Sequence, residues 1–340
     1  MGRLKPALSV VATSRNDDHG ANLLARMQLF VQGLAEQAER FGFPVELIVV
    51  EWNPPADRPP LSSALRWETS PHFQPRIITV PHELHDSYPN GDRIPLFQMI
   101  AKNAGIRRAA APFILATNID ILLSDELFAF LKGGLQPKAL YRTDRRDVKP
   151  SYEHRPLPTP AECRALPPLR EHGLDRSRFQ RSSRRVPSVG DVPRLAVGAW
   201  YRLVLPRLHT SGCGDFTLTS REVWDSIRGY PEWPIFSWHL DGLPLFQAYA
   251  GGVEMINLKD PMVAIHLEHS EGSGWTPEGS RALFSRLDTR GIPYLSTNQY
   301  KKMARGIVGK RKRAEPINGE DWGLASRVLE ETRPSGGVRA

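Results

Sequence analysis

Apolar and amphipathic segments alternate over the first 135 residues of the chain. Three apolar runs are typical of buried strands: LSVVAT (8–13), VELIVVEW (45–52) and RIITVP (76–81). After the first run, apolar side chains recur at spacings of four, three and four, on one face of a helix expected to end near Gly42: Leu23, Met27, Phe30 and Leu34. The pattern then predicts a helix, a strand and a helix at 95–110, 113–120 and 124–133. Such alternation predicts a parallel sheet covered by helices.

The pattern breaks at 141–210, where nine prolines and many arginines occur without a sustained period. We expect an insertion, lid or mobile loop here rather than an independent domain. Regular structure resumes at 215–230 and is followed by a helix around 241–250. Two strand-like runs, 254–258 and 262–269, come next, and the tail from about Lys301 is expected to be weakly ordered.

The formal net charge of +8 is concentrated in one segment. Residues 141–210 hold 15 Arg and Lys against 7 Asp and Glu, so the other residues are balanced as a group. The two cysteines, Cys163 and Cys213, stand outside any Cys/His cluster, which argues against a disulfide framework or a zinc site. No apolar run is long enough for a signal peptide or a membrane span, so we expect a cytoplasmic protein, with peripheral membrane contact through its basic segments left open.

Polar residues end several of the predicted strands. Thr13 and Arg15 follow the first, Glu51 ends the second, and Asn118 and Asp120 end the strand at 113–120. Because the carboxyl ends of parallel strands meet at one edge of a sheet, these side chains are expected to converge on a ligand.

The segments SVVATSRND, IVVEW and KNAGIRRAAAPFILATNID, spread over about 110 residues, resemble the nucleotide-binding half of inverting GT-A glycosyltransferases, enzymes similar to family 2 nucleotide-sugar transferases. The resemblance implies a Rossmann-like mixed α/β sheet with helices on both faces, to which this chain adds its basic insertion. It divides the chain into a nucleotide-sugar-binding half (1–140), the insertion (141–210), an acceptor-binding and catalytic half of the same domain (211–300) and a basic tail (301–340).

The same resemblance implies roles for individual residues. Thr13, Arg15 and Glu51 would contact the base and ribose, with Arg93 or Asn103 near the diphosphate or sugar. In the family an Asp-x-Asp motif holds a divalent metal that bridges the diphosphate. Here the motif reads Asn118-Ile119-Asp120, so Asp120 would bind the metal, while Asn118 would contact ribose or a metal-bound water. Asp120 alone could also serve as a cap for the helix that follows.

Residues 212–252, with Gly-Asp-Phe and Gly-Tyr-Pro-Glu, resemble the acceptor half of the same enzymes. By this match Asp241 is the catalytic base that takes the proton from an acceptor hydroxyl. Its alternative role is a charge favoured at a helix N-terminus. Asp215 would bind donor-sugar hydroxyls or pin a turn, and one aromatic residue, represented by Trp238, would stack on a sugar unless it belongs to the core.

A histidine late in the chain completes the metal site in many relatives, and His266 is our choice, with His269 as substitute. In a strand, His266 and Glu268 point to one face, while His269 is expected to point elsewhere. The metal implied is Mn²⁺ or Mg²⁺.

The implied reaction moves a sugar from a nucleoside-diphosphate sugar, with UDP favoured, to a carbohydrate, glycolipid or protein acceptor, with inversion. Two alternatives are a sugar-1-phosphate nucleotidyltransferase, for which TSRNDDHG contains too little glycine, and a nucleic-acid or polyanion binder on a degenerate transferase fold that uses the insertion and GKRKR. The sequence contains no recognised nucleic-acid motif, so no nucleic-acid partner is expected.

Overall fold

The computed structural model describes residues 4–153, 156–173, 205–269, 280–310 and 315–334. Its strands are β1 (Leu8–Ser14), β2 (Val45–Trp52), β3 (Phe73–Val80), β4 (Phe113–Thr117), β5 (Ile121–Leu123), β6 (Ala139–Val148), β7 (Arg170–His172), β8 (Phe216–Ser220), β9 (Glu254–Leu267) and β10 (Glu330–Thr332). Its helices are α1 (Leu23–Phe41), α2 (Leu61–Ala64), α3 (His82–Asp86), α4 (Gln98–Arg108), α5 (Asp125–Gly133), α6 (Pro160–Ala165), α8 (Arg221–Ile227), α9 (Leu243–Ala250), α10 (Ser280–Thr289) and α11 (Thr297–Lys310), with a 3-10 turn, η3 (Leu240–Gly242).

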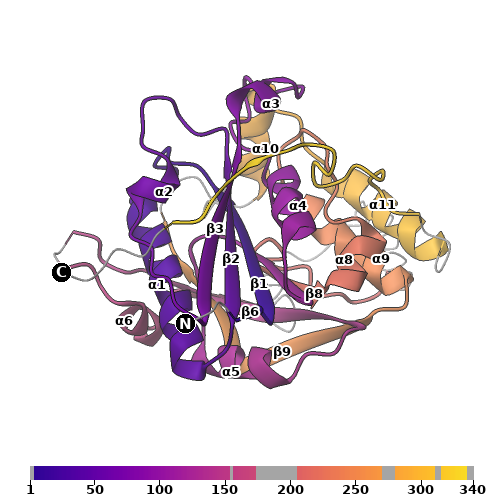
Figure 1. Ribbon diagram of the computed structural model, residues 1–340. Helices are drawn as coiled ribbons and strands as arrows, with labels where there is room; N and C mark the ends of the chain where they lie inside the picture. The colour runs from indigo at the N-terminus through magenta and orange to yellow at the C-terminus, as the bar shows by residue number, and fades with distance from the viewer. Residues whose placement is uncertain (1–3, 154–155, 174–204, 270–279, 311–314, 335–340) are drawn as a thin grey trace, which may run out of the picture.

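The strands form one mixed sheet in the order β10-β3-β2-β1-β4-β8-β6-β9-β5, and β7 pairs with β6 (Figure 1). The pairs β3-β2, β2-β1 and β1-β4 are parallel, whereas β8 runs antiparallel to both β4 and β6. The predicted fold class, a mixed α/β sheet with helices on both faces, is confirmed.

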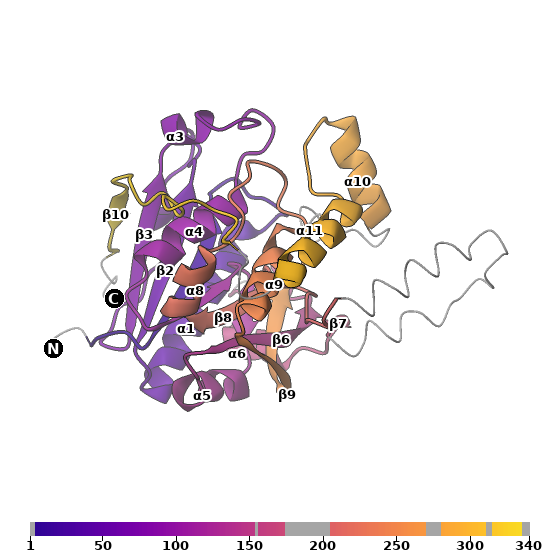
Figure 2. The ribbon, with the colours of Figure 1, turned by 90° about the vertical axis from the view of Figure 1, so that its right-hand side faces the viewer.

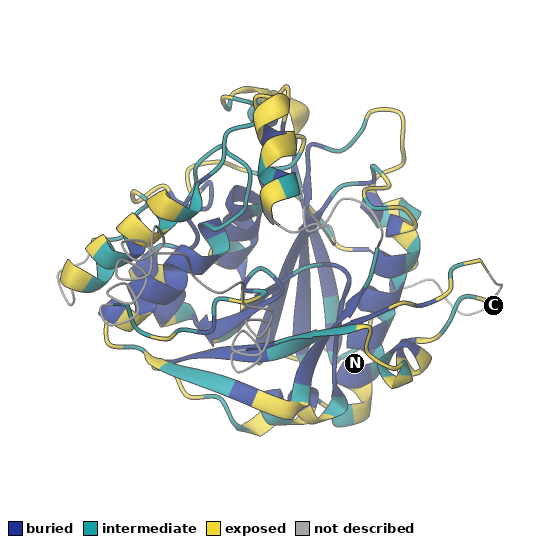
Figure 3. Cartoon of the chain, turned by 180° about the vertical axis from the view of Figure 1, so that it is seen from behind, coloured by how far each residue is buried: buried dark blue, intermediate teal, exposed yellow. Residues whose placement is uncertain are grey.

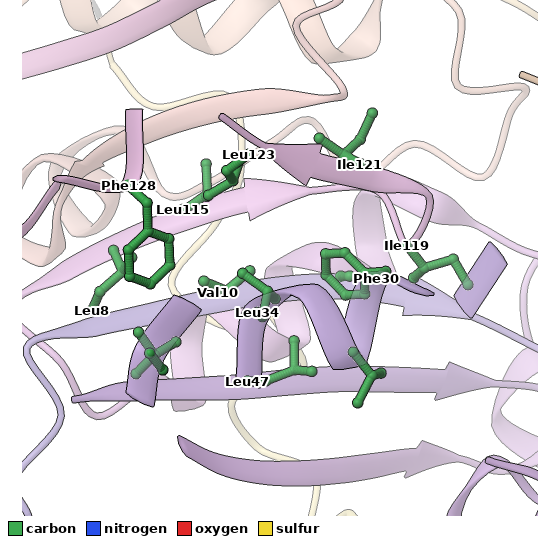
Figure 4. Packing of buried hydrophobic residues seen from close by; sticks show 14 of the residues in the cluster. Leu8, Val10, Phe30, Leu34, Leu47, Leu115, Ile119, Ile121, Leu123 and Phe128 are labelled. Carbon is green, nitrogen blue, oxygen red and sulfur yellow. The ribbon is translucent and has the colours of Figure 1, made fainter. Parts of the chain in front are cut away.

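Alternation along the central strands fills two cores. On one face, Val10 and Leu47 pack with Phe30 and Leu34 of α1 and with Phe128 of α5 (Figure 4). The helices α4, α8 and α9 lie on the far side of the sheet from α1 (Figures 1 and 2). Strand residues that face this side pack against them: Val11, Ile48, Val50 and Ile114. Because both faces are covered, the central strands are buried along their whole length (Figure 3).

The structure differs from the sequence expectation at 141–210. Residues 141–148 belong to β6, which lies inside the sheet between β8 and β9. Four consecutive charged residues, 144–147, occupy its second half and concealed the strand pattern. Of these, Arg145 and Asp147 face a polar site rather than the apolar core. Residues 174–204 of the expected insertion lie outside the described residues.

Two further expectations are corrected. The runs 254–258 and 262–269 were expected as separate strands, but β9 is continuous through Asp260 and Pro261 because both runs pair with β6, with a register shift between Thr143 and Asp144. The tail contains the end of α11, and β10 pairs with β3.

Within the described residues, no helix is both long and apolar enough to cross a membrane.

Gly105 sets the distance between α4 and the sheet. A β-carbon at this position would lie 2.5 Å from Cγ1 of Val11 and 3.1 Å from Cγ2 of Val50. We therefore expect Gly105→Ala to lower the free energy of unfolding by about 1–3 kcal/mol through overpacking. Urea unfolding measures it, with Gly306→Ala as the control: Gly306 is exposed on α11 with no atom within 4 Å of its β-carbon position, so alanine there should stabilise by about 0.5–1 kcal/mol. A Gly105→Ala protein as stable as the wild type would contradict the close approach.

Candidate functional site

The ends of β4 and β8 bring together two segments that are about 100 residues apart in the chain. Thr117 at the end of β4 pairs with Phe216 at the start of β8, and its hydroxyl donates to the backbone oxygen of Asp215 at 2.6 Å. Nδ2 of Asn118 then donates to Oδ1 of Asp215 at 2.7 Å. The residues that follow β4 and those that precede β8 therefore form one cluster.

Lys102 enters this cluster from α4 and is fully buried. Its ammonium donates to Oδ1 of Asn118 at 2.8 Å and to the backbone oxygen of Gly214 at 2.7 Å. Burial lowers the pKa of Lys102 to about 8, although the charges of Asp215, Asp241 and Asp120 act in the opposite direction. Gln98, one turn earlier on α4, donates to the same oxygen of Asn118 at 2.9 Å.

Asp241 lies in the η3 turn and adjoins the same cluster. A β-carbon on Gly214 would lie 3.2 Å from Oδ2 of Asp241 and 4.0 Å from Nζ of Lys102. Burial raises the pKa of Asp241, and the positive charges of Lys102 and Arg142 oppose this rise. The helix α9 begins only at Leu243, so Asp241 precedes the regular helix.

Asp120 lies next to two imidazoles. Nε2 of His266 is 3.7 Å and Nε2 of His269 is 3.4 Å from Oδ2 of Asp120, because β5 pairs with β9 and Ile121 stands opposite His266. The expectation that His269 points away is corrected: the chain leaves β9 at Leu267 and brings His269 back to Asp120.

The donor set of Asp120, His266 and His269 fits a divalent metal, since one ligand atom from each lies within 4.8 Å of the others. Nδ1 of His266 contacts Oδ1 of Asp147 at 3.2 Å, and a carboxylate on the far nitrogen is how ligating histidines are commonly oriented. One carboxylate with two imidazoles suits a transition metal such as Mn²⁺ better than Mg²⁺. Arg26 also donates to Oδ2 of Asp120, at 2.6 Å.

A chain of ion pairs joins this group to the Asn118 cluster. Arg145 on β6 contacts Oδ2 of Asp215 at 2.6 Å and Oδ1 of Asp147 at 2.9 Å. His172 on β7 lies 3.0 Å from Oδ2 of Asp147. Burial acts to raise the pKa of Asp147, but hydrogen bonds with His172 and His266 and the charge of Arg145 hold it well below its usual range. Similarly, burial acts to raise the pKa of Asp120, but His266, His269 and Arg26 outweigh it, and the net shift is strongly downward.

Thr13, Arg15 and Glu51 lie at the carboxyl ends of β1 and β2, where Ser14 pairs with Glu51. The Thr13 hydroxyl donates to the backbone oxygen of Val50 at 2.9 Å, and Arg15 donates to that of Pro95 at 3.4 Å. Oε1 of Glu51 accepts from the backbone N–H of Leu61 at 2.9 Å, and burial raises its pKa. The structure thus brings these three residues to one edge of the sheet, as the strand pattern predicts.

Two of the candidate residues have other partners. Asn103 is fully buried and bonds to both backbone groups of Tyr230 and to Glu232, so its amide holds the turn after Gly229. Arg93 bonds to the backbone oxygen of Gly291 and to Asn90. The structure does not bring either residue to the Asn118 cluster.

Trp238 belongs to an aromatic group formed by the segment before η3 together with α10 and α11. Its ring lies edge-to-face with Phe284 at 6.1 Å, and the neighbouring His239 stacks on Tyr300 at 4.5 Å. The indole is half-buried.

Sequence reasoning missed charged residues that complete the site. Lys102 and Arg26 lie on buried faces of helices, and a basic residue at an apolar position was the signal that could have identified them. Arg145, Asp147 and His172 lie in the segment that was expected to be irregular.

Comparison with known proteins finds similar solved structures but no match in sequence. No protein-family model matches the chain, and no curated protein matches it in sequence. Among solved structures, it is similar to the mannosyltransferase PcManGT from Pyrobaculum calidifontis in complex with GDP-Man and Mn²⁺ (11% identity, 90% of this chain, 70% of that chain, TM-score 0.38). It is also similar to the catalytic domain of Drosophila beta1,4-galactosyltransferase 7 in complex with xylobiose (11% identity, 92% of this chain, 83% of that chain, TM-score 0.38). A third neighbour is a mycobacterial protein (13% identity, 85% of this chain, 76% of that chain, TM-score 0.39).

Similarity of this size transfers no substrate, metal or reaction to the chain.

Arg26 and Asp120 form a buried ion pair, and removing Arg26 leaves the buried carboxylate with only the two imidazoles as partners among the described residues. We expect Arg26→Met to lower the free energy of unfolding by about 3–5 kcal/mol. The matched control is Arg40→Met on the same helix, because the Arg40–Asp125 pair is exposed and should contribute less than about 1 kcal/mol. Equal losses in the two variants, measured by urea unfolding, would show that burial does not distinguish the pairs.

Proposed function

We propose that this protein is an inverting glycosyltransferase that moves a sugar from a nucleoside-diphosphate sugar, UDP being favoured, to an acceptor hydroxyl. The observation that supports it is the meeting of two groups of residues predicted from separate parts of the sequence. Asn118 of the proposed donor half (1–140) bonds to Asp215 of the proposed acceptor half (211–300), and Asp241 adjoins Gly214 in the same cluster.

In the proposed reaction, the acceptor oxygen attacks the anomeric carbon as the bond from that carbon to the diphosphate oxygen breaks. The hydroxyl proton passes to the Asp241 carboxylate. Burial raises the pKa of Asp241 and so makes it a stronger proton acceptor, while the positive charges of Lys102 and Arg142 favour its ionised form. The anomeric configuration inverts because there is one displacement and no covalent enzyme intermediate.

Thr13, Arg15 and Glu51 would bind the nucleoside at the ends of β1 and β2, and Asp215 and Trp238 would bind sugar. A divalent metal, held by Asp120, His266 and His269, would supply positive charge to the departing diphosphate. The acceptor is a carbohydrate, glycolipid or protein, and the proposed location is the cytoplasm or the membrane surface.

Replacing Asp241 by asparagine keeps the shape of the side chain and removes the proton acceptor. We expect Asp241→Asn to lower kcat for sugar transfer by about 10²–10⁴-fold while nucleoside-diphosphate affinity is retained. Release of nucleoside diphosphate from a panel of nucleotide sugars and acceptors reports kcat, and calorimetry reports affinity. Asp225→Asn on the exposed face of α8 is the control and should leave both unchanged. Unaltered turnover in Asp241→Asn would remove Asp241 from the mechanism.

The fall of kcat at acidic pH is expected to follow the protonation of the Asp241 carboxylate. Since the pKa of Asp241 is raised from the ordinary 3.8 and only its ionised form accepts a proton, kcat should fall with acidification at a pH above 3.8. A transfer rate that stays level down to pH 3.8, in a protein shown by circular dichroism to remain folded, would contradict this role.

A further inference from the structure

The position of Lys102 suggests a role that the family resemblance does not supply. Its side chain is 0% exposed, and its ammonium is held by two neutral acceptors, Oδ1 of Asn118 and the oxygen of Gly214. Burying an ammonium is unfavourable unless nearby charges compensate it. The compensating carboxylates are those of Asp215, Asp241 and Asp120, all of which are proposed parts of the site.

The hydrogen bonds of Asn118 fix the orientation of its amide. Oδ1 accepts from Lys102 and Gln98, while Nδ2 donates to Asp215. A flipped amide would turn an NH₂ group towards the ammonium and an oxygen towards the carboxylate, and both contacts would be repulsive. An aspartate here would stand 2.7 Å from the Asp215 oxygen, so the pair of Lys102 and Asp215 favours asparagine.

We propose that Lys102 is a positioning residue whose ammonium, rather than a metal ion, binds the side-chain oxygen at position 118. It thereby provides a positive charge on the diphosphate side of the donor site. The oxygen that would ligate a cation in an Asp-x-Asp pair is bonded to the ammonium instead. The remaining donor set, Asp120 with His266 and His269, then holds a metal with one carboxylate. The proposal rests on the proposed function, because it assumes a donor diphosphate at this edge of the sheet.

The first test is a double-mutant cycle at positions 118 and 102, measured by calorimetric titration with Mn²⁺ alone. Asn118→Asp by itself should tighten Mn²⁺ binding by less than about threefold, because Lys102 pairs with the new carboxylate. The double variant Asn118→Asp with Lys102→Met frees that carboxylate and should tighten binding by about tenfold or more. If Asn118→Asp tightens Mn²⁺ binding as much as the double variant does, Lys102 does not control position 118 and the proposal fails.

The second test measures UDP and GDP affinity in EDTA. Loss of the positive charge in Lys102→Met should weaken whichever nucleotide the wild type binds by about tenfold, and exposed Lys138→Met is the matched control. Lys102→Gln keeps a hydrogen-bond donor without the charge, so an affinity equal to that of the wild type would overturn the charge role. It also replaces Lys102→Met in both tests if the methionine variant does not fold.

The proposed function and the role of Lys102 are contradicted by different results. A wild type that binds no nucleotide, with or without Mn²⁺, overturns the proposed function. The role of Lys102 alone is overturned if the wild type binds a nucleotide, the double variant binds Mn²⁺ no more tightly than Asn118→Asp, and Lys102→Gln binds the nucleotide as tightly as the wild type.

Discussion

Compensation of buried charge between β4, β6 and β9 is the constraint on which the rest of the site depends. Arg26 meets Asp120, His266 stands between Asp120 and Asp147, and Arg145 bridges Asp147 to Asp215. Each of these groups is mostly or fully buried, so each needs a partner of opposite charge to remain ionised. The network joins segments from both halves of the chain, and it fixes the positions of Asp120, His266 and Asp215.

The same network explains how the sheet accommodates a charged strand, β6, between β8 and β9. β6 is a central strand, yet its residues from Asp144 to Asp147 are charged. A strand of this composition is stable inside the sheet because β7, β9 and the residue that precedes β8 supply groups of opposite charge. The polar edge of the sheet is therefore as much a part of the fold as the two apolar cores on its faces.

Much of the architecture could be predicted from the sequence. Apolar runs identified β1, β2 and β4 because strands buried on both faces read as continuous hydrophobic segments. The same signal failed for β6, where alternate positions face the site. It also failed to join the two parts of β9, since the polar residues Lys259 and Asp260 interrupt the pattern while pairing with β6 continues on both sides.

The candidate site was predictable where residues follow strand ends. Asp120 and His266 were proposed from distant segments, and the structure places them 3.7 Å apart. For Asn103 the sequence could not separate two roles, because a polar residue on a helix beside the site gives the same pattern whether it faces a ligand or a buried turn; in the structure its amide bonds to the turn at Tyr230. Lys102, its neighbour in the chain, was overlooked although its apolar helix position marks it as buried, and the packing of α4 shows that it faces the cluster.

The most direct test of the account is a calorimetric and thermal-shift panel of nucleoside diphosphates and their sugars, with and without Mn²⁺, on wild type and Asp120→Ala. The account predicts saturable binding of one nucleoside diphosphate that Mn²⁺ strengthens in the wild type and not in the variant. If no nucleotide binds under any condition, the donor site does not exist, and the transferase assignment is contradicted.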